Sequence, residues 1–382
     1  MQAIILAAGN GKRFSPFSQN KPKPLFNFLG KSIIEHDLSE LKGIVDEVII
    51  VVGYRQEMII EKIGNNFDGI NIKYVEDKEV MGTALAVQKA KELVKGDFIL
   101  LNGDDLYFKD DIAKLKSPGI LVSEHQDPSS FGVVIKENGY LKDLIEKPSN
   151  PISNLVNTGL YYLPREILDI EVEKSSRGEY EFTDCVKKYI QQKTISVYEA
   201  DHWFPNSYPW DVFNAFPYLF LKEKKSRAFN KNATISKEAI IKKGTIIKSG
   251  AFIEGRVYIG ENCLIGPNCY IRDGSVIENN CKIGASVEIK NSIIGEGSNI
   301  SHLSYVGDSI IGENCNLGAG TITANLRHDN STVKVKVGDI LIDTKRKKLG
   351  AIIADNIKTG IGTLIYPGRK VLQNTMPGEK VI

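Results

Sequence analysis

Isoleucine recurs at every sixth position through much of the second half of the chain. Ten isoleucines keep this spacing without a break: Ile235, Ile241, Ile247, Ile253, Ile259, Ile265, Ile271, Ile277, Ile283 and Ile289. A six-residue period fits short strands joined by tight corners, three to a coil. Each isoleucine then points inward and stacks about 4.8 Å from the one that lies a full coil away. The period therefore predicts a parallel β-helix.

The repeat continues past Ile289 with irregular spacing. It slips over 294–317, is interrupted by a polar stretch at 326–348, and resumes around 352–366. The small corner positions, four residues after an isoleucine, hold four of the five cysteines, namely Cys263, Cys269, Cys281 and Cys315. Because no Cys-x2-Cys pair or nearby histidine accompanies them, packing is favoured over metal binding.

Length and charge limit the classes of function. A chain of 382 residues is long enough for two domains. Since 49 Lys and Arg nearly balance 47 Asp and Glu, no overall field favours nucleic acid or a membrane surface. The apolar start MQAIILAA is too short for a signal sequence, and no apolar run reaches the roughly 20 residues of a membrane span. Few cysteines favour a reducing compartment, so we expect a cytoplasmic protein.

The first half alternates between two kinds of pattern. Short apolar runs typical of strands lie at 3–8, 47–52, 98–101, 119–122 and 160–163. Patterns typical of helices lie at 32–41, 82–93 and 182–191. This alternation predicts an α/β domain with a doubly wound parallel sheet. A Lys-rich segment at 221–225 marks the junction, so we expect domains at 1–225 and 226–382.

A glycine-rich segment, LAAGNGKRF at 6–14, follows the first expected strand directly. Gly9 and Gly11 allow the backbone to curl around a phosphate with its N–H groups inward, and the basic pair after them adds positive charge. Soon afterwards PKPL, at 22–25, holds Lys23 between two prolines that restrict its backbone. These segments together predict a phosphate-binding site.

With these residues the chain resembles the sugar-1-phosphate nucleotidyltransferases, which begin with a Gly-rich loop ending in Arg and then Pro-Lys-Pro. Further segments match that family in order: MGTALAV (81–87), NGDD (102–105), FGVV (131–134), EKP (146–148), NTGLYYL (157–163) and RGEYEFTD (177–184). The resemblance implies a Rossmann-like fold. It also implies in-line attack of a sugar-1-phosphate oxygen on the α-phosphorus of a nucleoside triphosphate, with pyrophosphate leaving. Mg²⁺ is the implied cofactor, and UTP or dTTP the implied nucleotide.

The same resemblance implies roles for individual residues. Asp104 would hold Mg²⁺, Arg13 would contact the leaving phosphates, and Lys23 would contact the α-phosphate and the sugar phosphate. The residues implied in nucleotide or sugar binding are Gly9, Gly11, Gly82, Gly132, Glu146, Asn157 and Glu179.

Two departures from the family pattern affect this half. Many relatives complete the metal site with an aspartate where this chain has Pro205, so the adjacent Asn206 is the candidate second ligand, as a neutral oxygen donor. The family's glutamine that reads uracil or thymine is also missing, and Glu76 and Asp77 occupy its region. Because a carboxylate accepts from a ring N–H but cannot donate to a carbonyl, the base stays open and guanine is included.

The second half resembles the left-handed hexapeptide-repeat acyltransferases. It is most similar to the C-terminal half of the bifunctional enzymes that acetylate glucosamine 1-phosphate and then uridylylate the product. The segments that carry this resemblance are YIRDGS (270–275), ASVEIKNS (285–292), SHLSYVGDS (301–309) and NLGAGTITANLRHD (316–329). The β-helix is therefore expected to be left-handed, with acetyl-CoA as acetyl donor.

On this resemblance His302 would take a proton from the sugar amine as the amine attacks the thioester of acetyl-CoA. The other residues implied at the acetyl-transfer site are Arg272, Lys290, Tyr305, Asn316, Ala319 and Asn325. Arg272 and Lys290 are 18 residues apart, so one coil stacks two cations where they can clamp a phosphate. The family also implies a homotrimer or a dimer of trimers, with sites between subunits.

Three functions stay open from the sequence. The first is an enzyme with both activities, and the second a nucleotidyltransferase whose β-helix is an assembly scaffold. The third, a non-catalytic subunit like the related exchange-factor subunits of translation initiation, is disfavoured by Arg13, Lys23 and Asp104. Departures at 326–328 and Ser331, and a C-terminus about one to two hexads short of the family's acetyl-CoA-binding coils, support the second. The basic run KRKK at 345–348 fits either CoA phosphates or a solvated loop.

Overall fold

The computed structural model describes residues 1–226 and 230–382, which group by contacts into two units. The first comprises Met1–Gly11, Lys21–Leu25 and Ile33–Pro205. The second comprises Lys12–Asn20, Phe26–Ser32 and Asn206–Ile382. Two short segments near the N-terminus therefore belong to the second unit. Over the described ranges, no helix is both long and apolar enough to cross a membrane.

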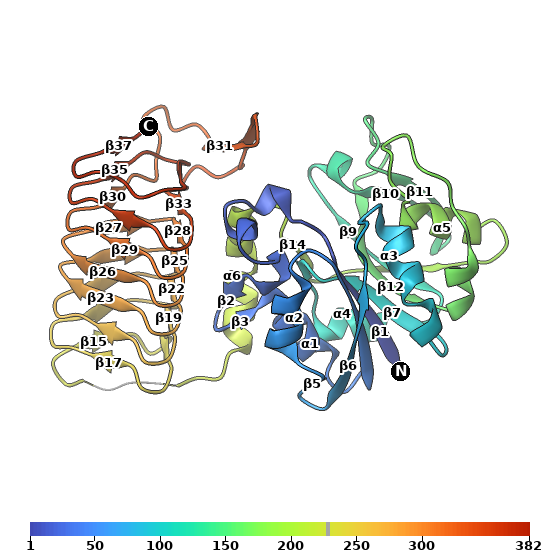
Figure 1. Ribbon diagram of the computed structural model, residues 1–382, viewed down its shortest axis with the longest axis horizontal. Helices are drawn as coiled ribbons and strands as arrows, with labels where there is room; N and C mark the ends of the chain where they lie inside the picture. Colours follow the sequence, from blue (N-terminus) through green and yellow to red (C-terminus); the bar gives the residue numbers. More distant parts are fainter. Residues whose placement is uncertain (227–229) are drawn as a thin grey trace. The chain divides into compact units, whose positions relative to one another are not determined.

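The first unit is built on a ten-stranded sheet in the order β10-β11-β13-β9-β12-β7-β1-β4-β6-β5 (Figure 1). Its strands are β1 (Gln2–Ala7), β4 (Glu47–Val52), β5 (Asn66–Phe67), β6 (Ile70–Glu76), β7 (Phe98–Asn102), β9 (Gly119–Glu124), β10 (Gly132–Glu137), β11 (Tyr140–Glu146), β12 (Leu155–Leu163) and β13 (Ser196–Glu199). Its helices are α1 (Ile33–Leu41), α2 (Gln56–Ile63), α3 (Thr83–Lys89), α4 (Lys109–Lys114) and α5 (Phe182–Tyr189). A small ladder of β8 (Asp105–Leu106) with β14 (Phe204–Pro205) completes the unit.

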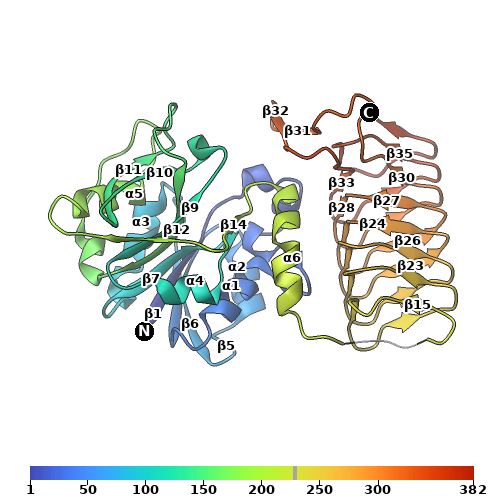
Figure 2. The same cartoon turned by 180° about the vertical axis from the view of Figure 1, so that it is seen from behind.

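Two apolar layers cover the sheet because successive strand residues point to opposite faces. Ile4 and Ile49 face a cluster that contains residues of α3 and α5. Ile5 and Ile50 face the cluster that contains residues of α1, α2 and α4. Figure 2, which shows the molecule from behind, makes the two helical layers visible. The doubly wound α/β architecture expected from the sequence is confirmed.

The sheet that was expected to be parallel is mixed. Strands β7, β1, β4 and β6 are parallel, but β12 runs antiparallel to both β7 and β9. The chain between β9 and β12 passes through the antiparallel pair β10–β11 and not through a crossover helix, and an antiparallel return needs no helix. In addition, β12 begins five residues before the predicted 160–163 strand, and α3 ends at Lys89, followed by a 3-10 turn at Lys91–Leu93.

The second unit contains the parallel β-helix expected from the six-residue period (Figure 1). Its stacked parallel strands are consistent with the left-handed form that the family resemblance implies. Its three parallel sheets follow the orders β15-β18-β21-β24-β27-β30-β35-β37, β16-β19-β22-β25-β28-β33-β36 and β17-β20-β23-β26-β29-β34. Most of these strands are two residues long. Those used below are β21 (Tyr270–Ile271), β24 (Glu288–Lys290), β26 (Asn299–His302), β27 (Tyr305–Gly307), β29 (Asn316–Leu317) and β30 (Ile322–Thr323). Helix α6 (Val212–Lys222) and the ladder of β2 (Asn27–Phe28) with β3 (Lys31–Ser32) also belong to this unit.

The register of the coils explains the irregular spacing. Ile271 pairs with Ile289, 18 residues on, whereas Ile289 pairs with Val306 after only 17. Val306 then pairs with Thr323, and Thr323 with Ile365, 42 residues later. The long step contains the hairpin of β31 (Lys334–Val337) and β32 (Ile340–Asp343), which leaves the stack of coils in Figure 1. The polar interruption in the sequence is therefore an inserted hairpin.

The stacked isoleucines dominate the stability of the β-helix. Ile271 has no exposed surface, so the change Ile271→Ala removes buried methyl groups and leaves a cavity in a column that cannot collapse. We expect a loss of about 2–5 kcal/mol of unfolding free energy, measured by chemical denaturation. The matched control is Ile246→Ala, because the Ile246 side chain is 60% exposed and its loss should change stability by less than about 0.5 kcal/mol. Equal effects of the two variants would contradict the packing argument.

A buried glutamate ties the β2–β3 turn to the coils within the second unit. Both carboxyl oxygens of Glu278 accept from the Gly30 N–H, at 3.0 and 3.3 Å. Burial raises the pKa of Glu278 to about 8, while the backbone N–H groups of Gly30 and Leu29 lower it and the negative charges of Glu296 and Cys263 raise it. The carboxyl group is therefore held in its neutral form below that pH.

The raised pKa of Glu278 predicts a pH-dependent stability. The unfolded side chain ionises near its usual value of 4.5, while the folded one keeps its proton to about pH 8. The free energy of unfolding is therefore highest below the unfolded pKa of 4.5, and it decreases as the pH rises from 4.5 to the folded pKa of about 8. We expect the thermal unfolding midpoint to fall between about pH 5 and pH 8.5, and to fall less in Glu278→Gln. Parallel pH profiles for the two proteins would refute the assignment.

Candidate active sites

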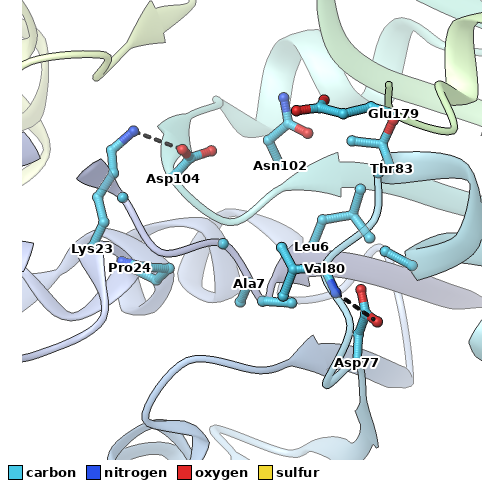
Figure 3. A pocket seen from close by; sticks show the side chains of 15 residues that line it. Leu6, Ala7, Lys23, Pro24, Asp77, Val80, Thr83, Asn102, Asp104 and Glu179 are labelled. Carbon is cyan, nitrogen blue, oxygen red and sulfur yellow. Dashed lines mark hydrogen bonds and ion pairs between the residues drawn. The ribbon is translucent and has the colours of Figure 1, made fainter. Parts of the chain in front are cut away.

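A pocket of the first unit lies where the parallel strands end. It is lined by Leu6, Ala7, Ala8, Gly9, Gly11, Lys23, Pro24, Asp77, Val80, Gly82, Thr83, Ala86, Asn102, Asp104 and Glu179 (Figure 3). Residues that follow β1, β6 and β7 meet here because the carboxyl ends of parallel strands share one edge of the sheet. Six residues predicted from the sequence are thus brought together: Gly9, Gly11, Lys23, Gly82, Asp104 and Glu179.

The pocket holds one close ion pair, between Lys23 and Asp104. The Lys23 ammonium donates to a carboxylate oxygen of Asp104 at 2.7 Å, and Figure 3 shows the two side chains converging. The Lys23 side chain is only 6% exposed, whereas that of Asp104 is 43% exposed. A 3-10 turn, Lys23–Leu25, fixes the lysine backbone, and the Leu25 N–H donates to the Pro22 carbonyl at 2.9 Å. The lysine is thus held in place, while the carboxylate keeps access to solvent and ligands.

The glycines of the pocket serve different purposes. At Gly9 a Cβ would meet nothing within 4 Å, so its side of the backbone stays open to a ligand. Gly82 has φ +134°, and a Cβ there would lie 2.3 Å from the Tyr180 carbonyl oxygen. Only glycine fits this approach, which holds the start of α3 against the 177–184 segment. The Ala84 N–H donates to the same carbonyl at 2.9 Å.

Gly132, Glu146 and Asn157 form a second group within the first unit, and they do not line the pocket described above. Gly132 pairs with Glu146 across β10 and β11, and its missing Cβ would contact both Glu146 and Asn157. Arg177 lies 3.4 Å from Glu146 and 3.0 Å from Glu181. Burial, and then the charge of Glu146, raise the pKa of Glu181. Arg177 is the first residue of the segment RGEYEFTD, but no role was predicted for it.

Two predicted residues, Arg13 and Asn206, belong to the second unit. The Arg13 guanidinium lies over the Tyr208 ring, 5.9 Å from its centre. Asn206 is fully buried, directly after β14. Their expected contacts with phosphates and Mg²⁺ stay predictions.

One edge of the β-helix gathers the residues of its predicted site. His302 ends β26 and Tyr305 begins β27, and the exposed Leu303 lies at the corner between these two faces. The Gly320 N–H donates to the His302 carbonyl at 3.3 Å, so Ala319 lies at the same corner, one coil further. The His302 side chain is exposed.

Asp308 joins several of these residues in a buried cluster. Its side chain is 7% exposed and accepts from Lys290 at 3.1 Å, from Asn291 at 2.8 Å, and from Asn325. The Asn325 amide also donates to the Tyr305 hydroxyl at 3.3 Å. Burial raises the pKa of Tyr305, while the nearby Lys290 charge lowers it. Asp308 lies in the segment SHLSYVGDS that carries the family resemblance, but no role was predicted for it.

Arg272 and Lys290 lie one above the other in the backbone of successive coils, as expected. The Arg272 N–H donates to the Ile289 carbonyl at 2.8 Å, so Arg272 and Lys290 occupy equivalent positions in successive coils. Each cation is paired with a carboxylate, Arg272 with Glu288 at 2.9 Å and Lys290 as described. Asn316 begins β29, on the face that carries His302.

The basic run at 345–348 is not uniformly exposed. The Arg346 guanidinium lies 5.2 Å from the centre of the Phe213 ring of α6, and it donates to Asn214 at 2.5 Å. Burial lowers the pKa of Arg346. Lys345, Lys347 and Lys348 are exposed. Arg346 therefore packs the base of the inserted hairpin against α6.

Comparison with known proteins covers the whole chain. The family model for nucleotidyl transferases matches residues 2–205, and that for the GMPPB C-terminal domain matches 253–372. The Bifunctional protein GlmU of Methanococcus aeolicus is 40% identical over all of this chain and 94% of its own length, and that of Methanocaldococcus jannaschii is 42% identical with the same coverage. A bifunctional sugar-1-phosphate nucleotidylyltransferase/acetyltransferase of Sulfurisphaera tokodaii is 38% identical over 97% of this chain and 94% of its own. The chain belongs to this bifunctional family.

Membership of the bifunctional family assigns to this chain both nucleotidyl transfer and acetyl transfer. A solved structure supports the fold of the first half. A Bacillus anthracis protein described as a glucose-1-phosphate thymidylyltransferase superposes with a TM-score of 0.53 and 23% identity, covering 59% of this chain and 98% of its own. The pocket around Lys23 lies in the part of the chain that matches the nucleotidyl transferase model, and His302 lies in the part that matches the GMPPB C-terminal domain.

Proposed function

We propose that the first half transfers a nucleotidyl group from UTP or dTTP to a sugar 1-phosphate, and that the β-helix acetylates an amino-sugar 1-phosphate, glucosamine 1-phosphate above all. The observation that carries the proposal is the Lys23–Asp104 pair inside a pocket whose backbone is opened by glycines. A fixed ammonium beside an accessible carboxylate suits a triphosphate and its metal ion.

The nucleotidyl step needs alignment and charge neutralisation and no covalent intermediate. A sugar-1-phosphate oxygen attacks the α-phosphorus in line, and the bond to pyrophosphate breaks. Lys23 offsets negative charge on the α-phosphate and the sugar phosphate, and Arg13 contacts the leaving phosphates. The remaining residues proposed for nucleotide and sugar are Gly9, Gly11, Gly82, Gly132, Glu146, Asn157 and Glu179.

The residues present fit Mg²⁺. Asp104 offers a partly exposed carboxylate inside the pocket, and magnesium typically takes one or two carboxylates together with substrate phosphates. We propose Asp104 as its ligand and Asn206 as a second, neutral oxygen donor. The ion would supply neutralisation of the charge that develops on the phosphates.

In the acetyl step, His302 accepts the proton of the sugar amine as the amine attacks the thioester carbon of acetyl-CoA, and the CoA thiol leaves. The backbone N–H of Ala319 stabilises the oxyanion. Arg272, Lys290 and Tyr305 hold the sugar phosphate, while Asn316 and Asn325 position the sugar and orient the base. Lys345, Lys347 and Lys348 are available for CoA phosphates.

We also propose a homotrimer or a dimer of trimers, with the acetyl sites between subunits. Large apolar side chains on the outer face of one sheet, such as Phe252 and Ile322, are 44% and 42% exposed and would be covered by a second copy. We propose domains at 1–225 and 226–382, with the boundary three residues after α6 ends. All five cysteines, which lie in the described ranges, are free, which supports a reducing cytosol.

The test uses the wild-type enzyme in two assays. Pyrophosphate release is measured with Mg²⁺, UTP or dTTP, and N-acetylglucosamine 1-phosphate or glucose 1-phosphate. Free-thiol release from acetyl-CoA is measured with glucosamine 1-phosphate and galactosamine 1-phosphate. Both products are expected. Pyrophosphate without thiol would make the β-helix an assembly scaffold, and no pyrophosphate from any pair would refute the nucleotidyl proposal.

A further inference from the structure

One of the three β-helix sheets is buried on its outer side as well as its inner side. This is the sheet β16-β19-β22-β25-β28-β33-β36, which follows one side of the stack in Figure 1. The second residue of its strands, such as Ile277, joins the core inside the coils, so the first residue points outward. These outward residues are nevertheless buried: Ile240, Tyr258, Val276, Ile293, Ile310 and Ile352. The outward residues Phe252 and Ile246 of the other two sheets are exposed.

A segment from the glycine-rich loop contacts the last strand of this sheet. Residues Lys12–Asn20 belong to the same unit as the β-helix. The ammonium group of Lys370, which begins β36 (Lys370–Val371), donates to the Ser15 carbonyl at 2.7 Å. The Lys370 side chain is partly buried, and burial lowers the pKa of its ammonium group. Lys370 therefore ties the loop segment to the β-helix through the backbone of Ser15.

A second segment, Phe26–Ser32, contacts the same sheet further along. The Gly30 N–H donates at 3.0 Å to Glu278, which follows β22 (Val276–Ile277). A Cβ on Gly30 would clash with the hydroxyl of Tyr258, one of the buried outward residues, and the φ of Gly30 is +78°. Only glycine fits this approach, so the β2–β3 turn lies directly against the sheet.

Aromatic rings join the two segments to each other. The Phe26 ring centre lies 5.1 Å from that of Phe14 and 5.2 Å from that of Phe17, and all three side chains are buried. The stretch between the segments, Lys21–Leu25, groups with the first unit and contains Lys23. The chain that carries Lys23 is therefore anchored at both ends to segments of the second unit.

The first segment also carries Arg13. Arg13 lies in the 3-10 turn Lys12–Phe14, directly before Ser15, and the Ser15 N–H donates to the Lys12 carbonyl at 3.3 Å. Both polar groups of this short piece of backbone are therefore engaged, one within the turn and one with Lys370. Because the backbone of Arg13 lies inside the turn, the contact at Ser15 limits how far Arg13 can move.

We propose that Lys370 is a positioning residue for nucleotidyl transfer, through which the β-helix holds the loop that presents Arg13 and Lys23 to the phosphates. Lys370 acts through the Ser15 carbonyl and not by contact with substrate. The rate of nucleotidyl transfer then depends on a residue near the end of the β-helix, so the two activities share a structural element. This inference rests on the proposed roles of Arg13 and Lys23.

The change Lys370→Met keeps most of the apolar side chain and removes the donor to Ser15. We expect kcat for pyrophosphate release to fall about 10- to 100-fold, because a small misplacement of groups that align the reaction is costly. The assay uses the nucleotide and sugar phosphate that the wild-type enzyme uses best. The KM for the nucleotide should change less than kcat, and acetyl transfer should stay at the wild-type rate.

Two further variants control for the loss of a lysine. Lys370→Arg can still donate to the Ser15 carbonyl and should restore most of the rate. Lys358→Met should leave pyrophosphate release unchanged, since Lys358 also begins a two-residue strand of the β-helix but has an exposed side chain. Equal losses of both activities in Lys370→Met, together with a lower thermal unfolding midpoint, would make Lys370 a residue of general stability and overturn the positioning role.

Hydrogen–deuterium exchange of the full chain separates this inference from the proposed roles of the loop residues. Peptides that cover residues 12–20 should exchange faster in Lys370→Met than in the wild-type protein. If Arg13→Ala and Lys23→Met keep the wild-type rate while Lys370→Met loosens the loop and slows the reaction, those roles fail and the positioning stands. Unchanged exchange in the loop, or faster exchange with undiminished pyrophosphate release, would refute the positioning.

Discussion

Replacing Asp104 by asparagine is expected to lower the rate of pyrophosphate release by about 100- to 1,000-fold, the loss typical of removing one group that stabilises charge in a transition state. Asp104 is the acidic partner of Lys23 at 2.7 Å, and its partly exposed carboxylate is the proposed anchor for Mg²⁺. An amide keeps the shape but removes the negative charge that a hard cation prefers. The assay is steady-state pyrophosphate release over a range of Mg²⁺ concentrations.

The magnesium series distinguishes metal binding from a general loss of the site. In Asp104→Asn the Mg²⁺ concentration for half-maximal rate should rise, because the ligand is weaker. In Lys23→Met the maximal rate should fall while that concentration should not rise, because the lysine contacts phosphate and its removal leaves the Asp104 carboxylate free of the competing ammonium. Acetyl transfer should be unchanged in both variants. An unaltered magnesium dependence in Asp104→Asn would exclude Asp104 as the metal ligand.

The β-helix could be predicted because its signal is strictly periodic. Each buried isoleucine repeats the environment of the one a coil before, as the pairing of Ile271 with Ile289 shows, so local sequence determines the fold. The inserted hairpin left only an interruption in that signal. Val333 and Val335 are buried at the base of this hairpin, but two apolar residues in a Lys-rich segment are too few to predict a hairpin.

The mixed sheet of the first unit could not be predicted in the same way. Apolar runs such as those of β9 and β12 identify strands but not their direction, because a buried parallel strand and a buried antiparallel strand have similar sequences. The direction of β12 depends on the β10–β11 hairpin between them. The turn of this hairpin, Asn138-Gly139, has positive φ at both residues and is a hairpin signal that the reading of alternating strands and helices left unused.

Only those site residues that lie in segments resembling a known family could be predicted from the sequence. Lys23 and Asp104 are 81 residues apart, and the resemblance to a family, not a pattern, joined them. Asp77 lines the pocket and Glu76 does not, because β6 ends at Glu76, and the sequence does not reveal where this strand ends. Asp308 was missed because its role comes from three partners on two coils.

The pairing of Lys290 with Asp308 affects how the acetyl site would bind its substrate. A phosphate near Lys290 and Arg272 meets cations whose charges are already balanced by Asp308 and Glu288. The partners differ in burial, since Asp308 is 7% exposed and Glu288 is 36% exposed. Glu288 can therefore turn to solvent when phosphate arrives, while Asp308 stays and orients Lys290 and Asn325. Arg272 supplies the uncompensated charge.

Replacing His302 by alanine is expected to lower thiol release from acetyl-CoA by about 100- to 10,000-fold, the range typical of a lost general base. His302 is the predicted general base, and its exposed side chain lies at the corner shared with Ala319. Pyrophosphate release should keep its wild-type rate, because the change lies in the β-helix.

His328→Ala is the matched control, since His328 is also an exposed histidine of the second unit but lies outside the predicted site. It should leave thiol release unchanged. A third variant, Asp308→Asn, removes the charge that orients Lys290. It should raise the KM for the amino-sugar phosphate more than it lowers kcat, whereas loss of the general base should mainly lower kcat. If His302→Ala keeps thiol release while Asp308→Asn reduces it, the edge binds the sugar phosphate but another group takes the proton.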